Sequence, residues 1–295
     1  MTWLSDDAVA RLRDVTELPD LSGTRYELVR ELGRGGMGVV YEVRDRELGR
    51  AVALKACDIV VSDADRLRRE AKIVARLEHP GIVPVHDVGV LPDGRLYYTM
   101  KLVRGARLDA WAREPRGRTD VLRLFARVCE AVAFAHANGV VHRDLKPENI
   151  MAGEYGAVLV MDWGIAHAAG EPFQRAIVGT AGYMAPEQTR GEEADARSDV
   201  YSLGAILRFL LGERLPRALE AIRARAMAAE RDRRYGNARE LGEDILRFLD
   251  GEPVSAYREN VFERAGRWLR RHQVLAAMVL AYLIMRAILL LWMNR

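Results

Sequence analysis

The feature that most constrains this chain is an octet of mostly polar residues, HRDLKPEN at positions 142–149, that lies between two apolar runs. Before it, residues 119–138 carry apolar side chains at three- to four-residue spacing and stop at Gly139, a pattern typical of a helix. After it, residues 150–151 and 158–161 are short apolar runs of the strand type. Packing alone does not require so many ionisable and amide groups in one loop. We therefore expect a loop held between rigid elements, where functional groups are commonly found.

Composition indicates a globular protein and gives no sign of a nucleic-acid partner. The 295 residues are 49% hydrophobic, which is ample for one large domain or two small ones. The net charge of +3 is small, and basic residues are mixed with acidic ones. Cys57 and Cys129 lie within apolar patterns, which suits buried free thiols in a reducing compartment. The N-terminus carries Asp6 and Asp7 without an apolar run, so no signal peptide is expected there.

A glycine-rich segment, GRGGMG at residues 33–38, stands between strand-type runs at 26–32 and 39–43. The pattern G-x-G-x-x-G is weak evidence alone, because it also opens the helix of dinucleotide-binding proteins. Residues 39–43 are β-branched or aromatic and lack a helix-capping residue, so we expect two antiparallel strands joined by the glycines. Two interpretations stay open for this stretch: an ordinary hairpin, or a loop that covers the phosphates of ATP.

Lys55 and Glu70 are expected to form an ion pair. Lys55 ends the strand-type run 51–55, and Glu70 lies on the apolar face of a helix expected between Ser62 and Leu77. A carboxylate among apolar side chains is costly unless a cation meets it. We expect Lys55 to be that cation, and the alternative is a glutamate that reaches solvent at the edge of the helix.

Taken in chain order, these segments resemble the protein kinase family, and in particular the bacterial serine/threonine kinases of the Hanks type. The octet matches the catalytic-loop pattern H-R-D-L-x-x-x-N, residues 162–164 (DWG) stand where the family has DFG, and residues 185–187 match A-P-E. The resemblance covers about residues 23–250. It implies an α+β, two-lobed protein kinase fold, with a small antiparallel β lobe plus one helix and a larger, mainly helical lobe.

The resemblance also implies roles for individual residues. Asp144 would accept or orient the proton of the substrate hydroxyl, Lys146 would steady the transferring phosphate, and Lys55 with Glu70 would hold the phosphates of ATP. Asn149 and Asp162 would hold Mg²⁺, or Mn²⁺ in its place, because amide and carboxylate oxygens suit such cations. The residues implied to bind the nucleotide are Leu32, Gly33, Gly35, Gly36, Gly38, Val40, Ala53, Lys55, Met100, Lys101 and Val103.

Some implied contacts are structural, and some positions depart from the family pattern. Glu187 would pair with Arg234, and Asp199 would tie down the backbone of the catalytic loop. Trp163 replaces a smaller aromatic residue, and Lys101 stands where related kinases often carry an acid. The chain also runs almost directly from residue 212 into a helix expected at 218–229, so the platform for protein substrates should be trimmed.

Residues 274–293 are apolar except for Arg286 and long enough to cross a bilayer. An arginine costs about 2.5 to 3.5 kcal/mol at mid-membrane, while the Leu, Ile and Val residues return about 3 to 6. The alternative is a hydrophobic helix buried in the fold or in an oligomer. Arginines are more frequent before this run than after it, which predicts a cell-membrane protein with one span and a cytoplasmic kinase domain. These arginines are Arg264, Arg267, Arg270 and Arg271 before the run and Arg295 after it.

The sequence thus predicts a membrane-tethered kinase that moves the γ-phosphate of ATP to Ser and Thr hydroxyls of proteins, itself included. The alternative is a pseudokinase that binds nucleotide without transfer, which the retained Lys55, Asp144, Asn149 and Asp162 disfavour. A homodimer is a further expectation. The predicted parts are a helical lead-in at 1–22, the kinase domain at 23–250, a basic juxtamembrane segment at 251–273 and a transmembrane helix at 274–293.

Regulation is expected to be unusual. An arginine directly before the catalytic aspartate, as Arg143 is here, usually accompanies a phosphate on the activation segment that orders the loop. Between Asp162 and Glu187 the only hydroxyl side chains are Thr180 and Tyr183, both close to the A-P-E motif. We therefore expect basal activity that does not depend on phosphorylation of that segment.

Overall fold

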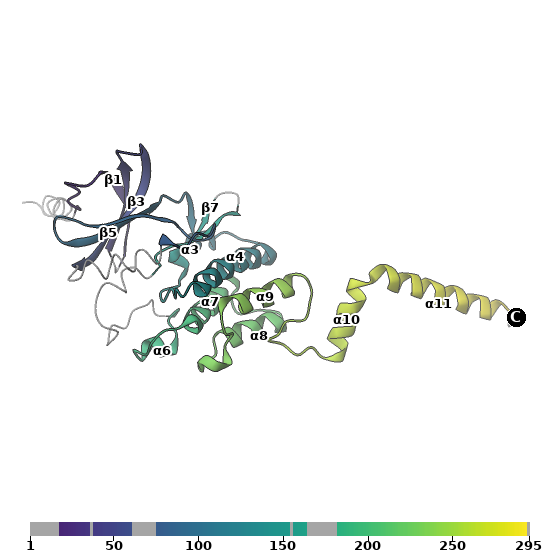
Figure 1. Cartoon of the computed structure of the whole chain (residues 1–295). Coiled ribbons are helices and arrows are strands. Elements are labelled where there is room, and N and C mark those ends of the chain that lie inside the picture. Colours follow the sequence, from purple (N-terminus) through teal and green to yellow (C-terminus); the bar gives the residue numbers. More distant parts are fainter. Residues whose placement is uncertain (1–17, 36–37, 61–74, 154–155, 164–181, 294–295) are drawn as a thin grey trace, which may run out of the picture.

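The computed structural model describes residues 18–35, 38–60, 75–153, 156–163 and 182–293. Figure 1 shows a β-rich lobe, a helical lobe beside it, and two C-terminal helices that extend away from both. This arrangement confirms the predicted two-lobed α+β fold.

In the described residues, the small lobe contains one antiparallel sheet of five strands in the order β1-β2-β3-β5-β4. Alternate residues of the second strand, Val39, Tyr41 and Val43, are buried on one face and pack with Leu54 and Tyr97. Since the glycine segment joins two antiparallel strands, it does not open a helix as in a dinucleotide-binding protein. The strands are β1 (Tyr26–Gly35), β2 (Gly38–Asp45), β3 (Arg50–Val60), β4 (Val85–Val90) and β5 (Arg95–Lys101).

The register between β3 and β5 decides which side chains share a face of this sheet. Lys55 lies directly opposite Tyr98, and Ala53 lies opposite Met100. Residues opposite each other on antiparallel strands have their Cβ atoms about 4.5 to 5.5 Å apart, so each pair points to the same side. One face of β3 and β5 therefore carries Lys55, Tyr98, Ala53 and Met100 together.

The large lobe is built around α4 (Arg118–Ala137), whose residues Phe125, Val128 and Val132 are fully buried. It packs against α9 and α7, as Figure 1 shows. The expected helix before the octet is thereby confirmed with ends displaced by one residue. The other helices of this lobe are α3 (Leu108–Trp111), α6 (Pro186–Thr189), α7 (Ala196–Leu211), α8 (Arg217–Ala226) and α9 (Ala238–Leu249), with 3-10 turns at Pro147–Asn149 and Arg231–Arg233.

The octet connects α4 to a small three-stranded sheet with the order β6-β7-β8. The strands are β6 (Gly105–Arg107), β7 (Ile150–Gly153) and β8 (Val158–Val160). Both apolar runs after the octet form strands, as their sequence predicts. The polar loop is thus fixed at one end by a helix of the core and at the other by a buried strand, Ile150 being fully covered.

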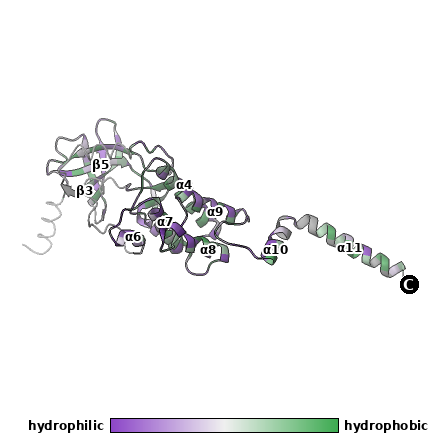
Figure 2. Cartoon of the chain, turned by 60° about the horizontal axis from the view of Figure 1, so that its bottom comes forward, coloured by the Kyte–Doolittle hydropathy of each residue, from purple (hydrophilic) through white to green (hydrophobic). Residues whose placement is uncertain are grey.

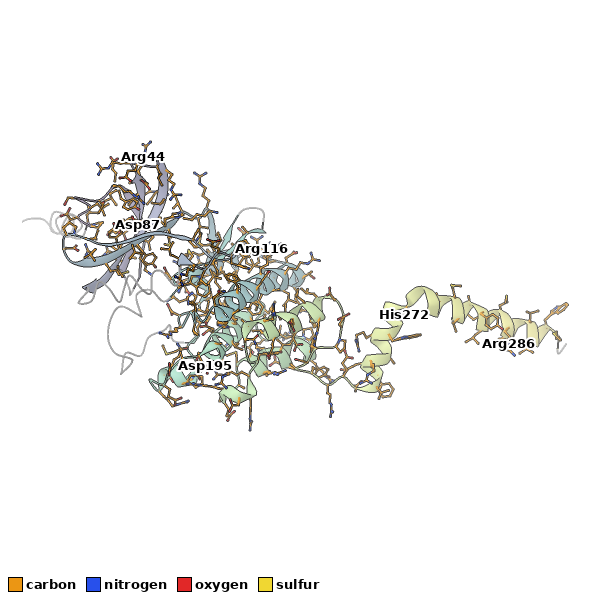
Figure 3. All side chains as sticks on the ribbon, viewed as in Figure 1. Arg44, Asp87, Arg116, Asp195, His272 and Arg286 are labelled. Carbon is orange, nitrogen blue, oxygen red and sulfur yellow. The ribbon has the colours of Figure 1, made fainter. Side chains whose placement is uncertain are left out.

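Two C-terminal helices, α10 (Val261–Arg271) and α11 (Gln273–Met293), follow the kinase lobes. Figure 2 shows apolar residues along α11, and Figure 3 shows Arg286 projecting from it. Within the described part of the chain, no helix meets the length and apolarity needed to cross a membrane. The helix is confirmed, but the predicted membrane span, and with it the membrane location and partner, is not supported.

The proposed alternative, a helix buried within its own fold, is not observed either. The apolar side chains of α11 whose exposure is described lie exposed between Met278 and Met293, and the main contacts of this helix with another element are with α10. The exposed residues include Met278, Val279, Tyr282, Leu283, Ile284, Met285, Leu289, Leu290, Trp292 and Met293.

Three expectations fall outside the described residues. They are the lead-in up to residue 17, most of the helix that carries Glu70, and the part of the activation segment that holds Thr180. The shortened connection after α7 is described: residues 212–216 lead directly from α7 into α8.

Candidate active site

A cleft of about 870 Å³ is lined by the sheet of the small lobe and the catalytic loop of the large lobe. Of the predicted site residues, Gly36 and Glu70 lie outside the described residues, and the others all line this cleft. These are Leu32, Gly33, Gly35, Gly38, Val40, Ala53, Lys55, Met100, Lys101, Val103, Asp144, Lys146, Asn149 and Asp162. Positions more than 100 residues apart in the sequence thus meet in one cavity.

Asp199 of α7 fixes the backbone of the catalytic loop, as predicted. The amide of His142 donates to its Oδ2 at 2.8 Å, and the amide of Arg143 donates to Oδ1 at 2.9 Å. His136 Nε2 lies 2.8 Å from Oδ2 as well. Complete burial would raise the pKa of Asp199, but these contacts outweigh burial and lower it. An ionised, fully satisfied carboxylate therefore holds the loop, including Arg143, whose backbone is left-handed with φ of 71°.

Asp144 sits at the floor of the cleft between two other residues of the octet. Lys146 Nζ lies 2.8 Å from Asp144 Oδ2. The amide nitrogen of Asn149 donates to the Asp144 carbonyl at 2.9 Å and to its Oδ2 at 3.2 Å. Because the nitrogen of Asn149 is used in this way, its side-chain oxygen remains as an acceptor for another group. The loop thus presents a carboxylate, an ammonium group and an amide oxygen close together.

Asp162, two residues beyond the end of β8, is held by two donors from the small lobe. Lys55 Nζ lies 2.8 Å from its Oδ2, and the Tyr98 hydroxyl donates to its Oδ1 at 2.8 Å. Burial acts to raise the pKa of Asp162, and Lys55 and Tyr98 together lower it. In this structure Lys55 therefore meets Asp162; the predicted partner, Glu70, is outside the described residues.

Sequence reasoning did not find Tyr98. Tyr97 and Tyr98 are adjacent and chemically identical. The register of β5 against β3 places Tyr98, and not Tyr97, on the face that carries Lys55. The alternation of a strand was the available signal, since successive side chains point to opposite faces.

Trp163 occupies the position of the family's smaller aromatic residue and is 2% exposed. Its ring packs against His142 with ring centres 4.8 Å apart, and its Nε1 donates to the Val160 carbonyl at 3.1 Å. The polar atom of the larger ring is thus satisfied inside the core, so this position tolerates tryptophan.

The donors present fit a hard divalent cation only in part. Asn149 and Asp162 offer an amide and a carboxylate oxygen at the same cleft, the chemistry that Mg²⁺ and Mn²⁺ prefer. Within the described ranges, no group of three or more His, Cys, Asp or Glu side chains forms a complete metal site. A cation at Asn149 and Asp162 would need further oxygens, such as those of a nucleotide's phosphates.

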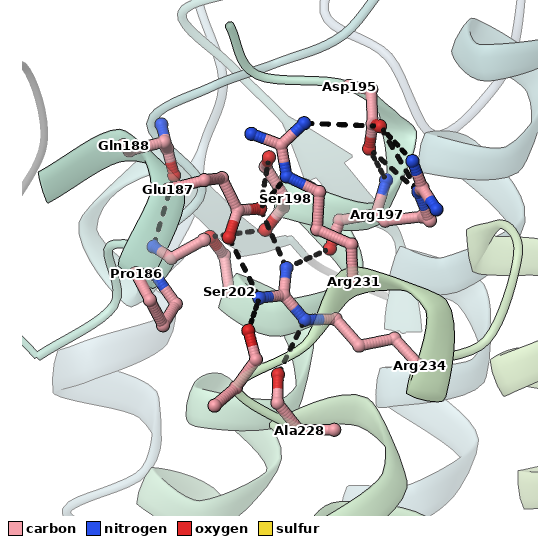
Figure 4. A network of polar contacts seen from close by, with 12 residues as sticks. Pro186, Glu187, Gln188, Asp195, Arg197, Ser198, Ser202, Ala228, Arg231 and Arg234 are labelled. Carbon is pink, nitrogen blue, oxygen red and sulfur yellow. Dashed lines mark hydrogen bonds and ion pairs between the residues drawn. The ribbon is translucent and has the colours of Figure 1, made fainter. Parts of the chain in front are cut away.

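Glu187 and Arg234, predicted to pair, form a bidentate ion pair in the core of the large lobe (Figure 4). Arg234 Nη1 and Nη2 contact Glu187 Oε1 and Oε2 at 2.7 and 2.8 Å, and both side chains are fully buried. The Ser198 hydroxyl donates to Oε1 at 2.7 Å. Burial opposes ionisation, but Arg234 and Ser198 outweigh it and lower the pKa of Glu187 to about 2. The pair anchors α6 next to the catalytic loop, whose Arg143 carbonyl accepts a bond from Gln188.

Comparison with known sequences and structures supports the resemblance. Residues 26–251 match the family described as the protein kinase domain. The chain is 37% identical over 283 residues to a probable serine/threonine-protein kinase, SCO3848, of Streptomyces coelicolor, with 81% of this chain and 42% of the relative covered. It is also 37% identical over 281 residues to the serine/threonine-protein kinase PknB of Mycobacterium tuberculosis, with 81% and 45% covered.

The chain spans less than half the length of these two relatives. Among solved structures, the PknI kinase domain of Mycobacterium tuberculosis superimposes with a TM-score of 0.61 at 28% identity, covering 78% of this chain and 98% of that domain. Neither the fold nor these similarities supports the predicted homodimer.

Proposed function

This chain belongs to the protein kinase family, and on that premise we propose that its cleft binds ATP and transfers the γ-phosphate to serine and threonine hydroxyls of proteins. The observation that carries the proposal is the convergence of Lys55, Asp144, Lys146, Asn149 and Asp162 on one cleft. Phosphoryl transfer depends on positioning and charge neutralisation, and these side chains supply a base, two cations and two ligands for a metal ion.

The small lobe is proposed to hold the nucleotide. Val40, Ala53 and Met100 offer apolar surface for the adenine ring, next to the backbone of Lys101 and Val103. The glycine segment between β1 and β2 brings backbone close to the phosphates, and Lys55 approaches them from β3. Lys55 is 6% exposed, so its charge acts in a sheltered environment where it is weakly screened.

The catalytic loop is proposed to handle the substrate hydroxyl. Asp144 orients the hydroxyl and accepts its proton, and Lys146, 2.8 Å from Asp144, steadies the phosphate that moves between the two substrates. Asp199 supports this step from below by fixing the amides of His142 and Arg143. Asn149 and Asp162 would hold Mg²⁺ or Mn²⁺, which neutralises phosphate charge when bound.

The alternative function, nucleotide binding without transfer, rests on the replacement at Trp163 and the shortened connection 212–216. Trp163 is satisfied within the core, and Asp162 beside it still faces the cleft. These observations favour an active enzyme.

The test is a phosphotransfer assay of the purified chain with labelled ATP, Mg²⁺ and a general protein substrate, followed by identification of the phosphorylated amino acid. Asp144→Asn should lower the rate about 100-fold or more, since loss of a general base costs 10² to 10⁴ in rate. Lys55→Met should also abolish transfer, and circular dichroism should show both variants folded. Equal rates for wild type and Asp144→Asn would falsify the proposal, and label on neither serine nor threonine would contradict the substrate class.

A further inference from the structure

We propose that Tyr98 is a positioning residue, whose hydroxyl keeps the Asp162 carboxylate in the orientation that receives the metal ion of a bound nucleotide. The inference rests on the proposed function, because it concerns a residue that contacts Asp162 of the same cleft.

The two oxygens of Asp162 are held by different donors. Tyr98 donates to Oδ1 at 2.8 Å, and Lys55 contacts Oδ2 at 2.8 Å. Both donors come from one face of the small lobe, since Tyr98 on β5 lies directly opposite Lys55 on β3. Tyr98 is 3% exposed, so its bond to Asp162 is sheltered from competing water. The carboxylate is therefore fixed in rotation as well as in position.

Asp162 needs such support because of its backbone. Its φ of 58° lies in the left-handed region, which is unfavourable for a residue that has a Cβ atom. It also lies just beyond the end of β8, so no strand pairing fixes its conformation. Contacts of the side chain help to hold it in place, and among the described residues Tyr98 and Lys55 make such contacts.

Lys55 and Tyr98 differ in charge, and this matters for a carboxylate that is proposed to bind a cation. In the proposed function Lys55 turns to the phosphates of the nucleotide, and its positive charge would repel a metal ion close to Oδ2. The Tyr98 phenol is a neutral donor that bonds Asp162 through its hydroxyl. It can hold Oδ1 without repulsion while Oδ2 faces the cleft. Partners that orient metal ligands commonly act in this way.

The competing explanation is that Tyr98 only fills the core, and the chain offers a matched control for it. Tyr98→Phe keeps the ring and removes the hydroxyl that touches Asp162. Tyr97→Phe makes the same chemical change one residue earlier, on the opposite face of β5, where Tyr97 packs edge-on against Tyr26 with ring centres 6.1 Å apart. Any difference between the two variants therefore reports the contact with Asp162.

The experiment measures the affinity of the full chain, kept in a mild detergent, for a fluorescent ADP analogue with excess Mg²⁺ and again with EDTA. The ratio of the two affinities is the gain due to the metal. In Tyr98→Phe this gain should fall about tenfold, as expected when an outer partner of a metal ligand is removed. Affinity in EDTA should match wild type, and Tyr97→Phe should keep the full gain.

Three results would overturn the inference. A full metal-dependent gain in Tyr98→Phe shows that the hydroxyl does not position Asp162, although the proposed function stands. A loss of affinity that is equal with and without Mg²⁺ shows a role in packing alone. If wild type itself gains nothing from Mg²⁺, the proposed function fails, and the inference fails with it.

Discussion

Glu187, Asp199 and Asp162 stay ionised because each has polar or charged donors at hydrogen-bond distance. Glu187 has Arg234 and Ser198, Asp199 has the backbone of the catalytic loop, and Asp162 has Lys55. Burial alone would raise the pKa of each carboxyl, and in all three the donors lower it below its usual value. Removing one member of such a pair leaves an uncompensated charge, which costs about 3 to 5 kcal/mol.

The Glu187–Arg234 pair predicts a specific acid sensitivity. The pKa of Glu187 is lowered from 4.5 to about 2, so folding favours its ionised form. Its contribution to stability is fully present above pH 4.5 and is lost as the pH falls from there to about 2. Glu187→Gln should be less stable than wild type at pH 7 and should lose less further stability across that window. Urea unfolding midpoints measured between pH 5 and about 2.5 check this expectation.

A matched control removes the same charge from an exposed site. Glu230→Gln, whose side chain is 63% exposed, should follow the wild-type curve throughout. If Glu187→Gln instead ran parallel to wild type over the whole range, the buried pair would not be the source of the acid sensitivity.

At the residue scale, the sequence was informative wherever a side chain belongs to a motif of fixed spacing. The pairing of Glu187 with Arg234 and the role of Asp199 under the catalytic loop were both expected from the motifs and are confirmed. The contact between Tyr98 and Asp162 could not be foreseen, because it depends on how β5 meets the end of β8. The roles of the individual site residues remain predictions.

At the scale of elements, the hairpin of β1 and β2 shows why its glycines are not equivalent. Gly38 has φ of 127°, and a Cβ atom there would lie 2.0 Å from the carbonyl oxygen of Ala56 on β3. A Cβ atom on Gly35, which pairs with Gly38, would meet no atom of the described residues within 4 Å. Glycine is required at position 38 because the backbones of β2 and β3 pack closely there and because its φ is positive. At position 35 no steric contact with the described residues requires glycine.

Gly38→Ala should therefore destabilise the small lobe while Gly35→Ala should not. A non-glycine residue forced into such a conformation costs about 1 to 3 kcal/mol, and the clash with Ala56 adds to it. Gly35→Ala should stay within about 0.5 kcal/mol of wild type, as is usual at open positions. Thermal unfolding without nucleotide measures both variants, and equal melting temperatures for the two would contradict the prediction.

The helices and strands were predictable where one local pattern dominates. The apolar spacing of α4 and the left-handed Gly139 at its end, with φ of 74°, placed that helix within one residue. The apolar residues that begin at Ile82 form strand β4 only from Val85, because Pro84 lacks an N–H and Ile82 bridges Val160 instead. The periodicity of a short segment cannot predict a bridge between residues so far apart in the sequence.

At the scale of the whole molecule, the kinase lobes bury most of their apolar side chains, whereas the last C-terminal helix exposes them. The lobes bury them in two hydrophobic clusters, whereas the described apolar side chains of α11 are exposed. The first of the two helices, α10, is joined to the lobes by polar contacts of Glu263 with Tyr257 and Arg217. An exposed apolar surface of this extent favours association.

We therefore expect the full chain to bind detergent micelles or to self-associate, and a chain that ends at Asn260 to be monomeric. The truncated chain should keep the phosphotransfer rate, because none of the described residues that line the cleft belongs to α11. Size-exclusion chromatography with light scattering gives the masses of both. Identical monomeric behaviour without detergent would show that α11 does not drive association.

Because Lys55 and Tyr98 lie opposite each other on β3 and β5, insertions and deletions within these two strands should be poorly tolerated during evolution. Both side chains must reach the same carboxylate, and side chains alternate between the faces of a strand. A single inserted or deleted residue upstream in either strand would turn one of the two away from Asp162. The exposed turn at Pro92–Asp93, which joins β4 to β5, carries no such constraint. Among natural relatives, length variation should therefore collect in that turn and be absent from β3 up to Lys55 and from β5 up to Tyr98.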